Sequence, residues 1–182
     1  MLSQFTKEAP HHVTLADLDF KFAKDVYPVG RLDADSEGLL LLTNDKRLNA
    51  RLLSPKHKQP KTYWVQVEGE PAQQDLAPLE TGITIKIKGK SHQTAPAKVH
   101  LLAAIPELPE RHPPIRIRKT VPDTWIAITL TEGKNRQVRR MCAAVGFSVL
   151  RLVRVGLAGF QYGVGQLSDM EVGAVIRVRI DI

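Results

Sequence analysis

The chain has 182 residues, and its 26 Lys plus Arg against 19 Asp plus Glu give a formal net charge of +7. With 43% hydrophobic and 25% charged residues, the composition is that of a folded protein and excludes wholesale disorder. Apolar runs such as residues 38–42 are far shorter than the roughly 18 residues of a membrane-spanning helix. No apolar signal core follows the first residue, and the single cysteine, Cys142, cannot form an internal disulfide, so we expect a cytoplasmic protein.

The charges are unevenly distributed along the chain. Residues 111–140 contain eight Lys or Arg against two Asp or Glu, and a smaller basic cluster follows residue 55: Lys56, Lys58 and Lys61. Three acids stand close together beside Arg31: Asp33, Asp35 and Glu37. A basic surface with a local acidic spot fits an enzyme that holds a polyanion and uses a carboxylate on it. A solvated, charged loop is the competing interpretation.

The predicted elements are mostly strands. Apolar residues predict a buried strand over 39–42, and Asn44 or Asp45 can cap a helix over 45–53, which ends at Ser54-Pro55. Short helices are predicted over 71–79, which begins with proline, and over 135–145, which Gly146 ends. Alternating or β-branched residues predict strands over 61–68, 83–88, 95–102, 115–118, 125–130, 148–155 and 172–182. The proline-rich segment 105–114 reads as an exposed loop, and the whole pattern indicates an α+β fold with a mixed, mainly antiparallel sheet and a few flanking helices.

The segment 30–45 can carry chemistry. It has the sequence GRLDADSEGLLLLTND, in which two glycines bound a short loop that contains three carboxylates and one arginine. A carboxylate held on such a loop can act as a nucleophile or as a base. The alternative is that Asp33 or Asp35 only accepts hydrogen bonds from nearby backbone N–H groups in a turn.

The helix predicted over 135–145 presents three arginines. Its apolar stripe centres near Val138 and Cys142, so Arg140 points nearly away from the core, with Arg136 close behind it. Arg139 lies at the boundary between core and solvent, where an arginine can pair with a partly buried carboxylate while its neighbours face phosphates. Three solvated arginines on a surface helix are the alternative.

Three motifs occur in a fixed order along the chain. Gly30-Arg-Leu-Asp33 precedes Gly38-Leu-Leu-Leu-Leu-Thr-Asn-Asp45, and then come Lys61-Thr-Tyr63 and Glu132-Gly-Lys-Asn-Arg-Gln-Val-Arg-Arg-Met141. Arg151-Leu-Val-Arg154 and Gly156 follow. This ordered set resembles the RNA pseudouridine synthases of the RsuA type, which modify bacterial ribosomal RNA. The resemblance spans about residues 27 to 182 and implies two lobes around an active-site cleft.

The resemblance implies a role for individual residues. Asp33 corresponds to the catalytic carboxylate, Tyr63 to the tyrosine that stacks on the target base, and Arg139 to the arginine that pairs with the catalytic aspartate. Arg31 is expected beside the site, where it helps to hold or open the RNA. Further basic residues of the motifs are expected to bind substrate: Lys61, Arg136 and Arg140. A core tyrosine beside Val65 remains the alternative for Tyr63.

The resemblance also implies the reaction. A specific uridine of ribosomal RNA, expected in the large subunit, would be flipped out and isomerised to pseudouridine by an aspartate nucleophile, without cofactor or metal. The partner would be ribosomal RNA or an assembling subunit, and the enzyme a monomer. Only 29 residues precede Gly30, so we expect residues 1–182 to form one catalytic domain without a separate N-terminal RNA-binding domain. Residues 111–140 are then candidates to share in site selection.

Other interpretations fit the residues less well. Asp35 and Glu37 are expected to serve turn and capping chemistry, and Cys142 to pack in the core. A catalytically silent RNA-binding module does not require a carboxylate that faces phosphates. A glycoside hydrolase needs two opposed carboxylates about 5–9.5 Å apart, which three acids within five residues of one loop do not provide.

Overall fold

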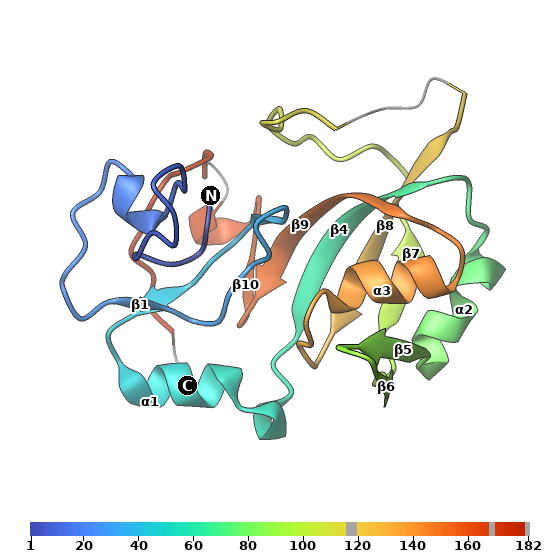
Figure 1. Cartoon of the computed structure of the whole chain (residues 1–182), viewed down its shortest axis with the longest axis horizontal. Coiled ribbons are helices and arrows are strands. Elements are labelled where there is room, and N and C mark those ends of the chain that lie inside the picture. Colours follow the sequence, from blue (N-terminus) through green and yellow to red (C-terminus); the bar gives the residue numbers. More distant parts are fainter. Residues whose placement is uncertain (116–119, 168–169, 181–182) are drawn as a thin grey trace.

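The computed structural model describes residues 1–115, 120–167 and 170–180. Its main sheet has the strand order β10 (Phe160–Gln161), β9 (Val149–Leu157), β4 (Lys61–Glu68), β8 (Asp123–Leu130) and β7 (Lys98–Leu101), and all neighbours are antiparallel. One short strand, β2 (Glu37–Gly38), adds to β9 in parallel. The expected mixed, mainly antiparallel sheet is therefore confirmed (Figure 1).

Two further strand pairs and three α-helices surround this sheet. The pairs are β1 (Tyr27–Pro28) with β3 (Leu42–Thr43) and β5 (Thr84–Ile87) with β6 (Lys90–Gln93). The helices are α1 (Lys46–Leu53), α2 (Gln73–Thr81) and α3 (Gln137–Ala144), and single 3-10 turns span Leu15–Asp17, Pro55–His57 (η2) and Gly165–Leu167. In Figure 1 the N-terminal segment with β1 and α1 lies on one side of β9 and β4, and α2, α3 and β5–β6 lie on the other, as two lobes would.

The hydrophobic core lies between the sheet and helices α2 and α3. Alternate residues of β4 and β8, among them Val65 and Ile128, are fully buried against Leu79 of α2 and Met141 of α3. This is the face that period-two alternation in the strands and the apolar stripe of α3 predict. The core therefore fixes α3 against the sheet, and with it the three arginines that α3 and its N-cap carry.

Local capping explains where the helices begin. The Asp45 carboxylate accepts hydrogen bonds from the backbone N–H groups of Arg47 and Leu48, at 2.7 and 3.1 Å, so α1 begins where the sequence predicts. Helix α2 begins two residues later than predicted, because the Asp75 carboxylate accepts from the Ala72 N–H at 2.8 Å and makes Ala72 the N-cap. Helix α3 ends before Gly146, whose φ of 96° is the left-handed conformation typical of a helix stop.

Two predicted strands are wrong. Residues 39–42 do not form one strand, because their backbone hydrogen bonds go to two different strands. The Leu39 N–H donates to a carbonyl of β9, whereas the Leu41 carbonyl accepts from the N–H of Val29, next to β1. Residues 172–180 form no strand, and Val172 is 80% exposed, so apolar enrichment did not lead to burial. Residues 116–119, in the strand predicted over 115–118, lie outside the described part of the chain, and the segment 105–114 is an irregular loop as expected.

Candidate active site

The loop between β1 and β3, residues 30–39, is attached closely to strand β9. Gly38 has a φ of 101°, and a Cβ at this position would lie only 2.2 Å from the Arg154 carbonyl oxygen. The Leu39 N–H donates to that carbonyl at 2.8 Å, and the Arg154 Nε donates back to the Leu39 carbonyl at 2.8 Å. Only glycine permits this approach, which explains why the motif has glycine after its acidic residues.

The other end of the loop is attached to the N-terminal segment. The buried Ser3 hydroxyl accepts from the Leu32 N–H at 2.9 Å and donates to the Leu32 carbonyl at 3.1 Å. The Ser36 N–H donates to the Asp33 carbonyl at 2.9 Å and closes a turn. The backbone of Asp33 is therefore held on both sides, while its side chain remains 29% exposed.

Asp35 carries most of the arginine contacts of this loop. Arg136 donates to both of its carboxylate oxygens at 2.9 Å, a bidentate pair, and Arg139 Nη2 lies 3.3 Å from Asp35 Oδ2. The hydrogen bonds from Arg136 and the nearby charge of Arg139 hold the pKa of Asp35 below its usual value. Asp33 has a looser contact, with its Oδ2 3.9 Å from Arg136 Nη1.

Arg139 occupies the boundary position predicted for it, beside Asp35. Its side chain is 13% exposed, and it donates to the carbonyl oxygens of Asp35 and Val149 at 2.9 and 3.2 Å. Burial lowers its pKa, and the charge of Asp35 opposes this. The expected pairing of Arg139 with Asp33 stays a prediction: the charge of Asp33 acts on Arg139, but among the described residues the ion pair of Arg139 is with Asp35. The reason is that Asp35, two residues later, lies closer to α3.

Tyr63 lies directly opposite Arg154 across strands β4 and β9. Its ring packs against the edge of the core, which both interpretations of Tyr63 allow, and its hydroxyl lies beside the guanidinium of Arg154, a residue that is 4% exposed. Burial raises the pKa of Tyr63, and the charge of Arg154 opposes this effect while Asp33 adds to it. Tyr63 is therefore within electrostatic reach of Asp33. Burial and the Arg154 charge lower the pKa of Lys61, whose Nζ donates to the Gln59 carbonyl at 3.0 Å.

Glu37 connects the loop to two further arginines. Arg151 on β9 donates to both Glu37 oxygens, at 3.0 and 2.8 Å, and Arg111 Nε lies 3.1 Å from Glu37 Oε1. Arg151 also donates to the Pro109 carbonyl at 2.7 Å, so the proline-rich segment is fixed to the same point. Residues 34–35 lie in a turn, as expected there, and the Asp35 and Glu37 side chains also form ion pairs, which were not predicted from the sequence.

Two expected site residues lie apart from this cluster. Arg140 points to the other side of α3, where it donates to the carbonyl oxygens of Lys86 and Asn135 at 2.7 and 3.2 Å. Arg31 is exposed, 3.9 Å from Glu8 in the N-terminal segment. Conversely, from the sequence no role was assigned to Arg154 or Ser3 and no ion-pair partner to Asp35 or Glu37. Only the position of Arg154 in the last motif could have pointed to it. The contacts of the other three residues are with residues distant in sequence, which a sequence motif does not show.

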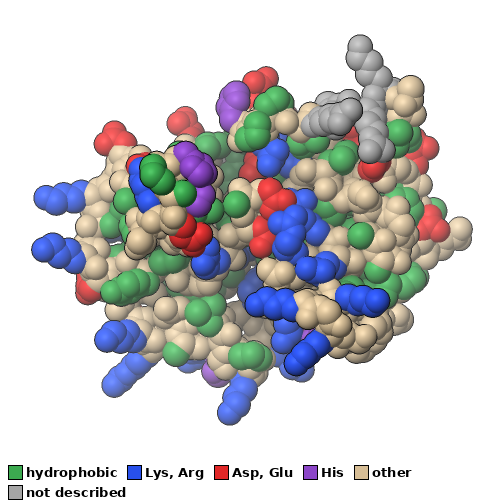
Figure 2. Space-filling model, in the orientation of Figure 1, with side chains coloured by type: hydrophobic (Ala, Val, Ile, Leu, Met, Phe, Trp, Pro, Cys, Tyr) green, Lys and Arg blue, Asp and Glu red, His purple; other side chains and the backbone are tan. Residues whose placement is uncertain are grey.

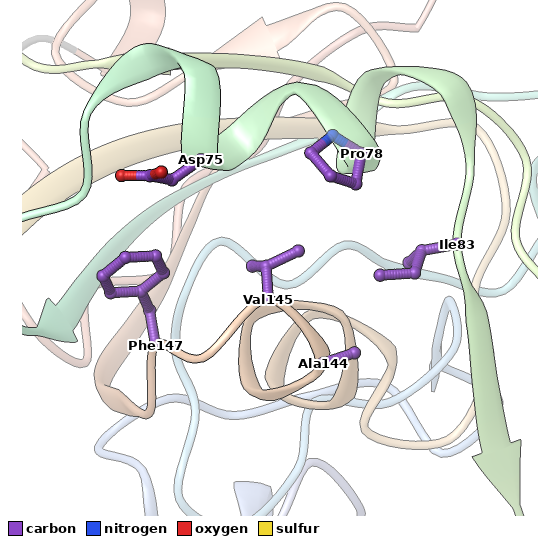
Figure 3. A pocket seen from close by; sticks show the side chains of 6 residues that line it. All are labelled: Asp75, Pro78, Ile83, Ala144, Val145 and Phe147. Atoms are coloured by element: carbon purple, nitrogen blue, oxygen red, sulfur yellow. The ribbon is translucent and has the colours of Figure 1, made fainter.

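The cluster lies outside the pocket shown in Figure 3. That pocket is between α2 and the end of α3, and it is lined by Asp75, Pro78, Ile83, Ala144, Val145 and Phe147. Acidic and basic side chains instead meet on the face of the molecule shown in Figure 2. Within the described ranges, no three His, Cys, Asp or Glu side chains are grouped to hold a metal ion. None of the helices that the structure describes is long and apolar enough to cross a membrane.

Comparison with known proteins identifies the class to which this fold and site belong. Residues 1–144 match the RNA pseudouridylate synthase family, and the chain belongs to this family. It is therefore an RNA pseudouridine synthase, an isomerase.

The individual relatives are more specific. The chain is 52% identical over 162 residues to ribosomal large subunit pseudouridine synthase E of Xanthomonas axonopodis pv. citri, covering 88% of this chain and 82% of that protein. It is also 52% identical to the protein of the same name from Vibrio parahaemolyticus, covering 89% of this chain and 65% of the relative. A crystal structure of a pseudouridylate synthase superposes with a TM-score of 0.64 at 31% identity, covering 81% of this chain and 55% of that one.

Proposed function

We propose that this enzyme converts a uridine of large-subunit ribosomal RNA to pseudouridine, with Asp33 as the nucleophile. The substrate is suggested by the names of its relatives, two of which are 52% identical over most of this chain. The observation that carries the role of Asp33 is the contrast with Asp35. Asp33 is partly exposed and only loosely paired at 3.9 Å, whereas Asp35 takes the short contacts to both arginines.

The difference in contacts between Asp33 and Asp35 suits Asp33 to act as a nucleophile. A carboxylate that accepts two short hydrogen bonds from one arginine has its lone pairs occupied, and its affinity for protons or carbon is reduced. Asp35 binds Arg136 in this way and leaves Asp33 with an accessible carboxylate oxygen beside positive charge. The anchored backbone on both sides of Asp33 holds that oxygen in place, which preorganises the attack.

The proposed reaction breaks one glycosidic bond and forms another. Asp33 attacks C1′ as the C1′–N1 bond breaks, and the bonding electron pair leaves with the uracil. The base turns so that C5 faces C1′, the C5–C1′ bond forms, and the Asp33 carboxylate is released. C5 then loses its proton to water, and N1 takes up a proton from water, which gives neutral pseudouridine. The steps need no oxidant, metal or organic cofactor, and none is proposed.

Before attack, the target uridine must leave its stack. Enzymes that act on a base in structured nucleic acid extrude it and hold it against aromatic or apolar side chains. Tyr63 supplies such a ring at the edge of the core, on the strand beside β9 and within the field of Asp33. We assign Tyr63 as the platform for the flipped base. We also assign Lys61, two residues earlier on the same strand, to an adjacent phosphate.

The remaining assignments follow from the same proposal. The partner is ribosomal RNA, free or in an assembling subunit, and the enzyme works as a cytoplasmic monomer. Residues 1–182 act as a single catalytic domain. Arg136 and Arg139 are assigned to the substrate side of the site, because both border Asp33 through Asp35.

Tritium release from ribosomal RNA that carries the label at uracil C5 tests the proposal. C5 loses its hydrogen only when it becomes the new glycosidic carbon, so release reports the complete reaction. We expect release by the wild type and a loss of more than about 10⁴-fold in Asp33→Asn, since a nucleophile is removed without a change of shape. Asp123→Asn, an exposed aspartate at the start of β8, is the matched control and retains activity. Release by Asp33→Asn at the wild-type rate would contradict the assignment.

A further inference from the structure

Helix α1 and the 3-10 turn η2 present a basic surface that the proposed chemistry does not use. Residues 46–61 contain six Lys or Arg and neither Asp nor Glu. Five of the six are exposed, and together they define the α1 basic surface: Lys46, Arg47, Arg51, Lys56 and Lys58. Figure 2 shows Lys and Arg side chains projecting from the lower left of this face, where Figure 1 places α1.

These five side chains are not neutralised by acidic side chains. Within the ranges that the structure describes, none of them has an ion pair or a side-chain hydrogen bond, whereas the arginines around Asp33 are paired with Asp35 or Glu37. The two aspartates next to α1 are engaged elsewhere: Asp45 accepts from the first backbone N–H groups of the helix, and Asp25 accepts from Asn44 at 3.1 Å. The surface therefore presents uncompensated positive charge.

The surface is joined to the proposed active site on both sides. In sequence, α1 and η2 lie between the loop that carries Asp33 and the strand that carries Tyr63. Leu53, at the end of α1, packs against the start of that loop, with its Cδ2 3.1 Å from the point that a Cβ on Gly30 would occupy. After η2 the chain passes through Gln59 into β4, where Lys61 lies half-buried near Arg154. Lys61 therefore lies between Tyr63 and the α1 basic surface along the chain.

We propose that the α1 basic surface binds the phosphates of the RNA strand that flanks the target uridine. This inference rests on the proposed function, because it takes RNA as the substrate. Flexible lysines and arginines without acidic partners favour a polyanion and read no particular base, so they contribute affinity and position rather than sequence recognition. Arg136, which the sequence suggested for phosphates, and its neighbour Arg139 are already held by Asp35 in the free protein.

Salt dependence of RNA binding measures this role. The triple variant Lys46→Gln, Arg47→Gln, Lys56→Gln removes three charges without removing a described contact. Each phosphate contact to a single strand contributes about 0.7 to the slope of log affinity against log salt, so the slope should fall by about 2. Between 50 and 200 mM salt, wild-type affinity for protein-free large-subunit ribosomal RNA should then fall by about 20-fold more than that of the variant. The matched control removes three exposed lysines elsewhere: Lys21→Gln, Lys24→Gln and Lys98→Gln.

The outcomes separate this surface from the proposed reaction. A reduced slope in the triple variant, a wild-type slope in the control, and an unchanged tritium-release rate at saturating RNA support the proposal. An unchanged slope, or an equal reduction in the control, overturns it, because general electrostatic attraction then explains the binding. If the wild type shows the expected slope but releases no tritium, the proposed function fails while the RNA-binding surface stands.

Discussion

Two basic segments of this enzyme have different structural roles. In the segment 111–140, Arg111, Arg136 and Arg139 are bound to acids of the loop that carries Asp33. In the segment 46–61, the exposed Lys and Arg have no acidic partner in the described structure. Both segments carry a similar excess of positive charge in the sequence. Charge counted along a sequence therefore does not tell whether a cation organises the protein or is free to bind a ligand.

The difference suggests a division of work. Paired arginines hold the loop 30–39 against β9 and α3, so their ion pairs stabilise the folded protein. Free lysines and arginines on α1 gain their interaction only when a polyanion arrives. Substitutions in the first region should therefore change stability and the rate of the chemical step. Substitutions in the second should change RNA affinity.

The largest effect on stability is expected at Gly38. In Gly38→Ala, a Cβ would meet the Arg154 carbonyl oxygen at 2.2 Å, and the φ of 101° adds backbone strain. We expect a loss of about 2–4 kcal/mol in the free energy of unfolding. Gly89→Ala is the matched control, because it has a similar φ of 80° but open space around the added Cβ, and it should cost about 1 kcal/mol. Denaturant unfolding of both variants measures the difference, and equal losses would contradict the close docking of the loop on β9.

A smaller effect is expected on the chemical step at Asp35. In Asp35→Asn, Arg136 and Arg139 lose their carboxylate and turn to Asp33, whose oxygen becomes less nucleophilic. We expect kcat to fall by about 10- to 100-fold with little change in KM, and Asp35→Glu to recover most of the loss. Steady-state tritium release provides both constants. A rise in KM alone would show that Asp35 acts in RNA binding instead.

The same variant has a pH signature that reports its contribution to folding. Because hydrogen bonds from Arg136 lower the pKa of Asp35 in the folded protein, the ionised carboxylate stabilises the fold above its usual pKa of 3.8. That stabilisation is lost as pH falls through the lowered pKa. The melting temperatures of wild type and Asp35→Asn should therefore differ at pH 7, and the difference should shrink as the pH falls below 3.8 towards the lowered pKa. A difference that stays constant as the pH falls well below 3.8 would contradict the ion pair.

The smallest effect is expected when the free cations are neutralised. The triple variant Lys46→Gln, Arg47→Gln, Lys56→Gln should change the free energy of unfolding by less than about 0.5 kcal/mol per residue. Loss of positive charge at the first turn of α1 is favourable to the helix dipole and offsets any lost packing. Thermal unfolding measures this. A large destabilisation would show that these side chains have structural partners.

Local signals in the sequence predict much of the fold. The helix cap at Asp45, the helix stop at Gly146 and the alternation in β4 and β8 all depend on neighbours within a few residues, and each is confirmed. The strand over 172–182 failed in its described part because composition does not reveal whether a partner strand is available. The break in residues 39–42 likewise depends on β9 and on Val29, which are remote in sequence.

The site was predicted less completely than the fold. The ordered motifs identified the family, and α3 presents Arg139 at the expected boundary. The motifs did not predict that Asp35, rather than Asp33, forms the close ion pairs with the arginines. Which of two aspartates so close in sequence faces α3 depends on the conformation of the turn. The cross-strand pairing of Tyr63 with Arg154 depends on strand register, which the motifs do not contain.

Single-turnover tritium release, measured over a range of RNA concentrations, tests the separation of chemistry from affinity most directly. Wild type, Asp33→Asn and the triple variant Lys46→Gln, Arg47→Gln, Lys56→Gln are compared at one salt concentration. We predict no release by Asp33→Asn at any RNA concentration, and release by the triple variant that reaches the wild-type rate only at higher RNA. Release by Asp33→Asn, or a lower limiting rate in the triple variant, would contradict this separation.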